Sequence, residues 1–254
     1  MRIQRIGSSP LKGGRHASHE AAEFGLDGPV GDRVFAVVDL ERGRVLKTVE
    51  HPALMSCEAH WTDGVLSIVI GGWPFTARPE PAGRQRELDY WGRPAPVEVV
   101  DGPWAAAFSA LLGREVALAR ASRAGAVVFG ESVTVVTTSS LRRLSRETGG
   151  EVDARRFRSN LVIDTGDADD HVEDSWAGRE LAVGDIRLQV ADGIPRCAVI
   201  DMHPDSGASG SRLLTTLAGY RHDAGEIPFG VYARVTRPGV VSRGDEVHLL
   251  RALA

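Results

Sequence analysis

Short runs of β-branched and other apolar residues, bounded by turns that contain glycine, recur along this chain and constrain its fold more than any other feature. The runs are 34–39, 66–70, 133–136, 161–164 and 186–190. Bounding turns include Arg42-Gly43, Asp63-Gly64 and Gly71-Gly72. Repeated short strands with such turns are typical of sheets and barrels. We therefore predict a mainly β (α+β) fold.

Two stretches interrupt this pattern with helical signals. An apolar, helix-favouring run over 105–112 follows Asp101, an acidic N-cap candidate, and ends at Gly113. A second stretch, over 141–147, is closed by glycines. We predict that the first helix packs in a core and that a domain boundary falls between it and Val127.

Length and charge limit the classes of function. At 254 residues the chain can bury one large core or two modest ones. A formal net charge of −4 argues against nucleic-acid binding and restricts any anion site to a local cluster of Arg and Lys. No apolar run is long enough to cross a bilayer, and the start lacks a signal-peptide hydrophobic region. We predict a cytoplasmic protein with no membrane contact.

The two cysteines differ in their surroundings. Cys57 and Cys197 lie far apart, so we expect free thiols, and two cysteines are too few for an iron–sulfur cluster, which needs about four thiolates. The run around Cys57 is typical of a small buried hydrophobe. Cys197 follows Pro195 and Arg196. A cation beside a thiolate favours its use as a soft metal ligand or a nucleophile.

A cluster of hydroxyls, from Thr137 to Ser140, lies between the strand over 133–136 and the second helical stretch. The pattern leaves two interpretations open. In one, Ser139 or Ser140 simply caps the helix. In the other, the hydroxyls and the unsatisfied N–H groups of the first helical turn bind an anion.

Three arginines, Arg155, Arg156 and Arg158, precede the strand over 161–164. Such a group is usually a solvated face. On a strand, however, Arg156 and Arg158 would point to the same side and converge on a phosphate, which the planar guanidinium binds well.

Two other polar segments favour structural roles. The acidic run over 164–174, which includes His171, matches no hard-cation loop, so we predict a solvated loop there. His203 follows Cys197 by six residues, and we do not assign it the role of proton donor.

A series of short motifs runs through the second half of the chain. They are Arg155-Arg156-Phe157-Arg158-x-Asn160, Glu173-Asp174-Ser175-Trp176, Leu181 to Asp185, Arg196-Cys197, Pro204 to Gly207, Leu213 to Leu217, Phe229 to Tyr232 and Gly239 to Asp245. In this order the motifs resemble the MOSC domain family, which is named after the C-terminal part of molybdenum cofactor sulfurase.

The start of the chain is similar to the β-barrel domain that often precedes a MOSC domain. Pro10-Leu11-Lys12 and Gly31-Asp32-Arg33 carry this similarity. Gly13 departs from it, because many relatives have a serine there. The resemblance implies an N-terminal β-barrel-like domain at 1–118, a MOSC domain at 119–254 and a cofactor in the cleft between them.

The resemblance also implies roles for individual residues. Cys197 would be the catalytic residue and would supply a thiolate to molybdenum. The residues implied to hold the molybdenum cofactor (Mo-molybdopterin) are Lys12, Arg33, Thr138, Ser139, Ser140, Arg156, Arg158, Asn160 and Arg196.

The activity implied is that of the amidoxime-reducing branch, an oxidoreductase acting on N-hydroxylated or related N-oxygenated small molecules. A separate redox protein of ferredoxin, flavin or cytochrome type would deliver electrons. Two alternatives stay open: a sulfur carrier or sulfurtransferase with a persulfide on Cys197, and a protein that binds the cofactor without turnover.

Overall fold

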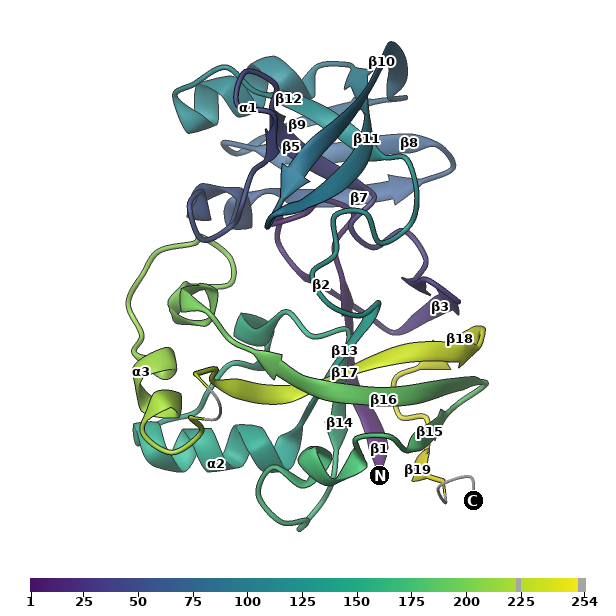
Figure 1. The fold of residues 1–254 in the computed structure, drawn as a ribbon, viewed down its shortest axis with the longest axis vertical. Helices are drawn as coiled ribbons and strands as arrows, with labels where there is room; N and C mark the ends of the chain where they lie inside the picture. The colour runs from purple at the N-terminus through teal and green to yellow at the C-terminus, as the bar shows by residue number, and fades with distance from the viewer. Residues whose placement is uncertain (223–224, 251–254) are drawn as a thin grey trace.

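The computed structural model describes residues 1–222 and 225–250, and these form two lobes (Figure 1). Strands dominate both lobes, which confirms the prediction of a mainly β fold. We call them the barrel lobe, drawn at the top of Figure 1, and the sheet lobe, drawn below it. Among the described residues, no helix combines the length and the apolar character needed to span a membrane.

The sheet lobe is built on one eight-stranded sheet. In spatial order its strands are β19 (Val247–Leu249), β15 (Glu180–Val183), β16 (Ile186–Pro195), β17 (Pro228–Arg237), β13 (Val133–Thr137), β14 (Leu161–Asp164), β1 (Arg2–Ser8) and β2 (Ala17–His19). A three-stranded sheet lies beside it, in the order β18 (Gly239–Ser242), β3 (Ala21–Gly25) and β4 (Gly28–Pro29). Helices α2 (Thr138–Thr148) and α3 (Leu213–Ala218) also belong to this lobe (Figure 1).

The barrel lobe contains a closed barrel and a smaller sheet. The barrel strands are β10 (Glu80–Tyr90), β11 (Arg93–Asp101), β12 (Ala117–Ala121), β5 (Phe35–Asp39) and β6 (Arg44–Val45). The smaller sheet has the order β7 (Glu58–Thr62), β8 (Val65–Ile70) and β9 (Trp73–Ala77). Helix α1 (Trp104–Leu112) packs on it, and Trp104 and Phe108 of α1 are fully buried in the core of this lobe. The core helix predicted over 105–112 is confirmed, including its end at Gly113, which has the left-handed φ of 64°, but its N-cap is Pro103 and not Asp101.

The first strands of the chain pair with strands from its second half. β1 is antiparallel to β14, with Ile3 opposite Ile163, and β3 is antiparallel to β18. The predicted domains, 1–118 and 119–254, stay a prediction, and residues 223–224 and 251–254 of the second lie outside the described residues. The pairing shows that the sheet lobe also contains the start of the chain.

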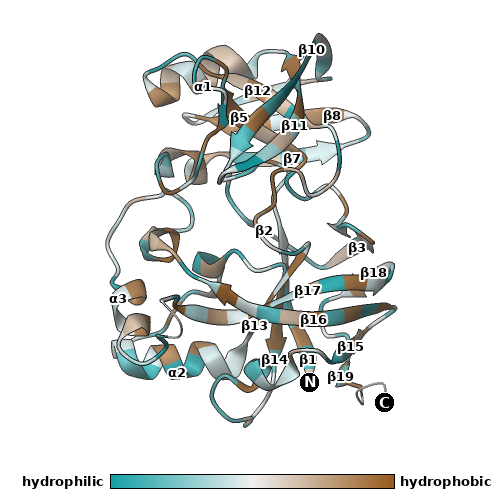
Figure 2. Ribbon diagram, viewed as in Figure 1, coloured by the Kyte–Doolittle hydropathy of each residue, from teal (hydrophilic) through white to brown (hydrophobic). Residues whose placement is uncertain are grey.

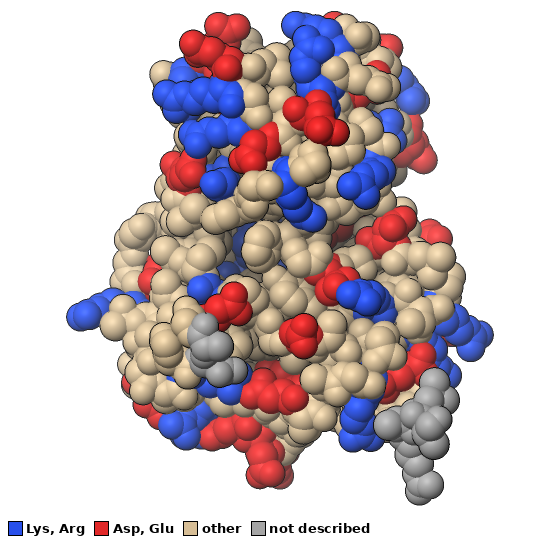
Figure 3. Space-filling view, viewed as in Figure 1, with Lys and Arg blue, Asp and Glu red and all other residues tan. Residues whose placement is uncertain are grey.

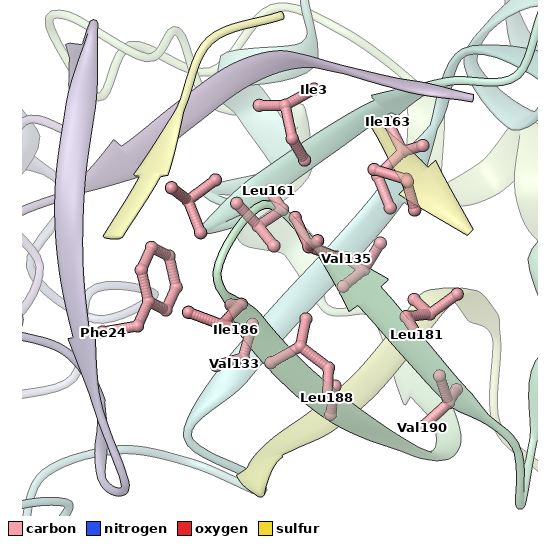
Figure 4. Close-up of a cluster of buried hydrophobic side chains, with 14 of the residues drawn as sticks. Ile3, Phe24, Val133, Val135, Leu161, Ile163, Leu181, Ile186, Leu188 and Val190 are labelled. Carbon is pink, nitrogen blue, oxygen red and sulfur yellow. The ribbon is translucent and has the colours of Figure 1, made fainter. Parts of the chain in front are cut away.

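Each lobe has its own hydrophobic core. Figure 4 shows the cluster in the sheet lobe, in which Ile3 and Phe24 from the start of the chain share one core with residues such as Val135 and Leu188. In Figure 2, hydrophobic and hydrophilic residues alternate along some strands, whereas β5 and β13 are buried at every position. The burial pattern of β8, in which every second residue from Leu66 is buried, follows this alternation.

Among the described residues, four short 3₁₀ helices complete the fold: Pro52–Ser56, Ala154–Phe157, Val172–Trp176 and Ala198–Asp201. The second of them corrects the sequence interpretation, because Arg156 and Arg158 do not lie on a strand. Asp153 caps this turn, its carboxylate accepting a hydrogen bond of 2.9 Å from the backbone N of Arg155. Pairing with β1 then begins only at Leu161.

Candidate functional site

A pocket of about 170 Å³ lies where the two lobes meet, and it gathers the chain's exposed cysteine with five cationic residues. These are Cys197 with Lys12, Arg33, Arg156, Arg158 and Arg196. Figure 3 shows Lys and Arg atoms deep in the hollow between the lobes. Six of the ten residues implied by the resemblance thus share one pocket, although up to 185 positions separate them (197 − 12).

The end of strand β16 places Cys197. Pro195 is opposite Pro228 at the end of the β16–β17 ladder, and Cys197 then becomes the N-cap of the 3₁₀ helix Ala198–Asp201. Its carbonyl accepts a hydrogen bond from the N of Ile200, while the residue itself stays exposed. Cys57 is fully buried in the barrel lobe, as predicted. Both cysteines are free thiols.

Arg196 is fixed underneath this turn by backbone carbonyls. Its Nε donates to the carbonyl of Phe229 at 2.8 Å, and its Nη1 donates to that of Phe157 at 3.0 Å. Its Nη2 is buried and has no hydrogen-bond partner in the described part of the chain. Burial lowers the pKa of Arg196 to about 10.

Arg33 and Arg158 reach the pocket from strained backbone positions. Their φ angles are 51° and 53°, in the left-handed region that non-glycine residues seldom adopt. Such outliers persist where the surrounding structure imposes them, and they occur often at functional sites. Arg33 lies 3.5 Å from the carboxylate of Asp32. Arg158 forms no salt bridge with any described residue, and its buried Nη1 lacks a partner.

Mutual repulsion and burial perturb the cations of this pocket. Burial, then the charges of Arg33 and Arg158, lower the pKa of Lys12 from 10.5 to about 7. Burial, then Arg33, lowers the pKa of Arg158 to about 10. Asp32 partly opposes both shifts. A group of half-buried cations with too few carboxylates is a site that an anion would complete.

Arg156 has a structural contact as well as a place in the pocket wall. Its Nη1 donates to the carbonyl of Met202 at 2.8 Å, which holds the segment that follows Cys197. Arg156 and Arg158 therefore both line the pocket, as the resemblance implies, but through a turn and not through strand alternation.

Asn160 lies behind the pocket wall and orients it. It is fully buried. Its Oδ1 accepts from the N and the hydroxyl of Thr134, at 3.0 and 2.9 Å, and its Nδ2 donates to Asp32 at 3.2 Å and to the carbonyl of Gly7. Asn160 thus joins a pocket-lining hydroxyl to the carboxylate beside Arg33.

The hydroxyl cluster is not part of this pocket. Thr137, and not Ser139 or Ser140, caps α2, accepting from the N of Ser140. Thr137 and Ser140 also donate to the buried carboxylate of Glu173, at 2.6 and 2.5 Å. The chain's own carboxylate therefore occupies the helix N-terminus, where one of the two open interpretations, and the resemblance, placed an external anion.

The remaining members of the cluster have other surroundings. Ser139 is fully buried and lies 3.0 Å from the Thr137 hydroxyl. Thr138 contacts Asp164 and borders a separate surface groove along α2. The structure thus places Thr138, Ser139 and Ser140 apart from Cys197.

The acidic run is only partly a solvated loop. Asp167 and Asp169 are exposed, as predicted, but Glu173 is buried, and its carboxylate accepts hydrogen bonds at the start of α2. His171 packs between the rings of Phe229 and Tyr220. Within residues 1–222 and 225–250, no three His, Cys, Asp or Glu side chains are grouped so as to hold a metal ion.

Sequence reasoning missed several uncharged residues of the pocket. These are Thr48, Tyr90, Phe129, Thr134 and Tyr232. Tyr232 lies in the motif Phe229 to Tyr232, but no local signal marks the other four as pocket residues. Thr48 lies beside Gly13, the position where many relatives have a serine. A Cβ at Gly13 would lie 2.8 Å from the Thr48 hydroxyl, so that hydroxyl fills the space beside the glycine.

Comparisons with known proteins agree on one family. The MOSC domain model matches residues 120–248, about half of the chain. Mitochondrial amidoxime-reducing component 1 of Homo sapiens is 34% identical over 125 residues, which are 46% of this chain and 36% of the human protein. Molybdenum cofactor sulfurase of Drosophila pseudoobscura pseudoobscura is 30% identical over 115 residues, 45% of this chain and 14% of that protein.

The chain therefore spans 36% of the length of the human relative and 14% of the length of the Drosophila relative. Among solved structures, the YUAD protein from Bacillus subtilis aligns over 98% of this chain and 96% of its own, with a TM-score of 0.46 and 11% identity. On the family match, which includes Arg158, Asn160 and Cys197, this chain belongs to the MOSC domain family.

Proposed function

We propose that this protein is a molybdenum-cofactor-dependent oxidoreductase that reduces N-hydroxylated or related N-oxygenated compounds. One observation carries the proposal: an exposed thiol, Cys197, shares a pocket with Lys12, Arg158 and Arg196. None of these three cations forms a salt bridge with a described carboxylate. A relative with an amidoxime-reducing name supports the reaction class.

The residues of the pocket fit this cofactor. Its phosphate needs cationic donors, and Arg158 Nη1 and Arg196 Nη2 are buried donors without a partner among the described residues. Its metal needs a soft protein ligand, and Cys197 is a free, exposed thiol beside these donors. Lys12, Arg33, Arg156, Arg158 and Arg196 would hold the phosphate end, and Cys197 would bind the metal.

When bound, the cofactor would supply two-electron redox chemistry for removing oxygen from the substrate nitrogen. The N–O bond breaks, two electrons and two protons are consumed, and an amine or amidine and water leave. The chain's own residues bind and orient the reactants between the lobes. Electrons would come from a separate redox protein of ferredoxin, flavin or cytochrome type.

The direct test measures metal and turnover together. Protein made in a host that produces the cofactor is expected to contain close to one molybdenum per chain, by elemental analysis. With a chemically reduced electron donor, it should convert benzamidoxime to benzamidine. A full load of molybdenum with no reduction of any N-oxygenated compound would contradict the reductase and favour a protein that only binds the cofactor.

A second candidate, sulfur transfer, is favoured by the exposure of the Cys197 thiol and by relatives named molybdenum cofactor sulfurase. A sulfane-sulfur donor, such as another persulfide, would load Cys197, and an acceptor nucleophile would then take the outer sulfur and leave the Cys197 thiolate. Protein without molybdenum that releases cyanide-labile sulfur, and loses it in Cys197→Ser, would support this candidate against the reductase.

We expect the affinity for the cofactor to fall as the pH rises from about 7 to about 9, where a phosphate monoester is already doubly ionised. Because the pKa of Lys12 is lowered to about 7, its ammonium loses its proton above that pH and no longer attracts the phosphate. Conversely, the cofactor-free protein should gain stability over this range, since only the unfolded chain keeps the proton.

Cofactor release during dialysis at several pH values, together with urea unfolding of the cofactor-free protein, measures both trends. Lys12→Met is the control, because the variant has no group to titrate and should lose both pH dependences. If cofactor release depended on pH equally in wild type and in Lys12→Met, Lys12 would not contact the phosphate.

A further inference from the structure

Trp91 occupies a turn that tryptophan fits poorly. It links β10 and β11 through a two-residue turn, in which Tyr90 pairs with Arg93 and both Trp91 and Gly92 have positive φ, 57° and 77°. This type I′ geometry favours Asn-Gly, because a bulky side chain is strained at φ above zero. A strained and exposed tryptophan calls for a contribution other than stability of the turn.

Trp91 packs against Phe129 at the edge of the pocket. Their ring centroids are 5.8 Å apart in an edge-to-face arrangement. Phe129 lines the same pocket as Cys197, yet Phe129 and Trp91 stay 49% and 45% exposed. Large aromatic surfaces left open to solvent at a pocket are available to a ligand.

The surrounding contacts hold this aromatic pair in place. The guanidinium of Arg93 donates to the carbonyl of Val128, which ties the hairpin to the segment that carries Phe129. The ammonium of Lys47 lies 4.2 Å from the centroid of the Trp91 ring, a cation–π contact that orients the indole. Tyr90, the residue before Trp91, belongs to the pocket wall but is itself fully buried.

We propose that Trp91 and Phe129 form an aromatic subsite at the mouth of the pocket and select planar, aromatic N-hydroxylated substrates. The inference rests on the proposed reductase function and names its substrate class. The ring of the substrate would lie against Trp91 and Phe129 while its N–OH group points toward Cys197. Edge-to-face and stacked contacts favour a flat ring over a saturated ring of similar size.

The test compares benzamidoxime with cyclohexanecarboxamidoxime, which share the reacting group and differ in the planarity of the ring. Calorimetry on cofactor-loaded protein without an electron donor measures binding in the absence of turnover. We expect wild type to bind benzamidoxime roughly threefold to tenfold more tightly than the saturated compound.

Trp91→Asn and Phe129→Leu should each bring this ratio close to one. Asn suits the turn, so Trp91→Asn is expected to fold at least as stably as wild type. Trp73→Asn is the matched control, since Trp73 is 73% exposed on β9, does not line the pocket and, unlike Trp91, does not pack against Phe129, so its ratio should match wild type.

Three outcomes overturn the subsite: wild type that binds both rings equally, wild type that binds neither, or Trp91→Asn with an unchanged ratio. Tight, ring-selective binding without reduction, once an electron donor is added, would support the subsite while removing the reductase function. Reduction of both compounds, bound with equal affinities, would support the reductase function and remove the subsite.

Discussion

Cys197→Ser is expected to abolish reduction of N-hydroxylated compounds while leaving the fold intact. Cys197 is exposed at the start of a 3₁₀ helix, so a serine hydroxyl of similar size should not disturb packing. The serine hydroxyl, however, is a hard ligand that stays mostly protonated, whereas the metal favours a soft thiolate. Loss of a group that only orients a metal ligand costs roughly 10- to 100-fold. Removing the ligand itself should therefore cost at least about 100-fold in turnover.

Molybdenum content should fall less than activity, because the phosphate end keeps Lys12, Arg158 and Arg196. The visible spectrum of the loaded protein should change, since it reports sulfur bonded to the metal. Cys57→Ala is the control: Cys57 is fully buried in the barrel lobe, so this variant should keep its activity and lose about 1 kcal/mol of stability. A Cys197→Ser protein with wild-type turnover and an unchanged spectrum would exclude Cys197 as the metal ligand.

Short runs of β-branched and other apolar residues predicted β5, β8, β13, β14 and β16, and local helix signals predicted α1 and α2. Pairing between distant strands was not predictable in the same way. One of the two partners of β1 is β14, more than 150 residues later, and nothing in Arg2–Ser8 specifies that partner. Local propensity does not encode which strands meet, because tertiary packing decides it.

The charged residues of the site were identified because motifs in order mark Lys12, Arg33, Arg158 and Cys197. The uncharged ones were missed, since Tyr90 and Phe129 are ordinary aromatic residues until folding brings them together. The hydroxyl cluster shows the opposite limit. A helix N-terminus predicts an anion, but the sequence does not say that the anion is Glu173 of the same chain.

Arg158→Met is expected to change stability and cofactor affinity in opposite directions. The Nη1 of Arg158 is buried without a partner among the described residues, and burial together with Arg33 lowers its pKa to about 10. An unsatisfied buried donor costs about 1–3 kcal/mol, so its removal should stabilise the cofactor-free protein by a similar amount. Methionine keeps the linear stem and, like arginine, lacks branching at Cβ, so the strain at φ 53° is unchanged.

The cofactor-loaded protein should respond in the other direction. A charge-assisted hydrogen bond contributes about 1.5–3 kcal/mol, so its loss should weaken retention of the cofactor roughly 10- to 100-fold. Thermal unfolding of both forms and molybdenum retained after dialysis measure the two effects, with exposed Arg84→Met as the control expected to change neither. If Arg158→Met destabilised the cofactor-free protein, the guanidinium would be a structural group and not a donor kept in reserve for an anion. A gain in stability of the cofactor-free protein together with a loss of cofactor retention is thus specific to a binding site whose cations repel one another until the ligand binds.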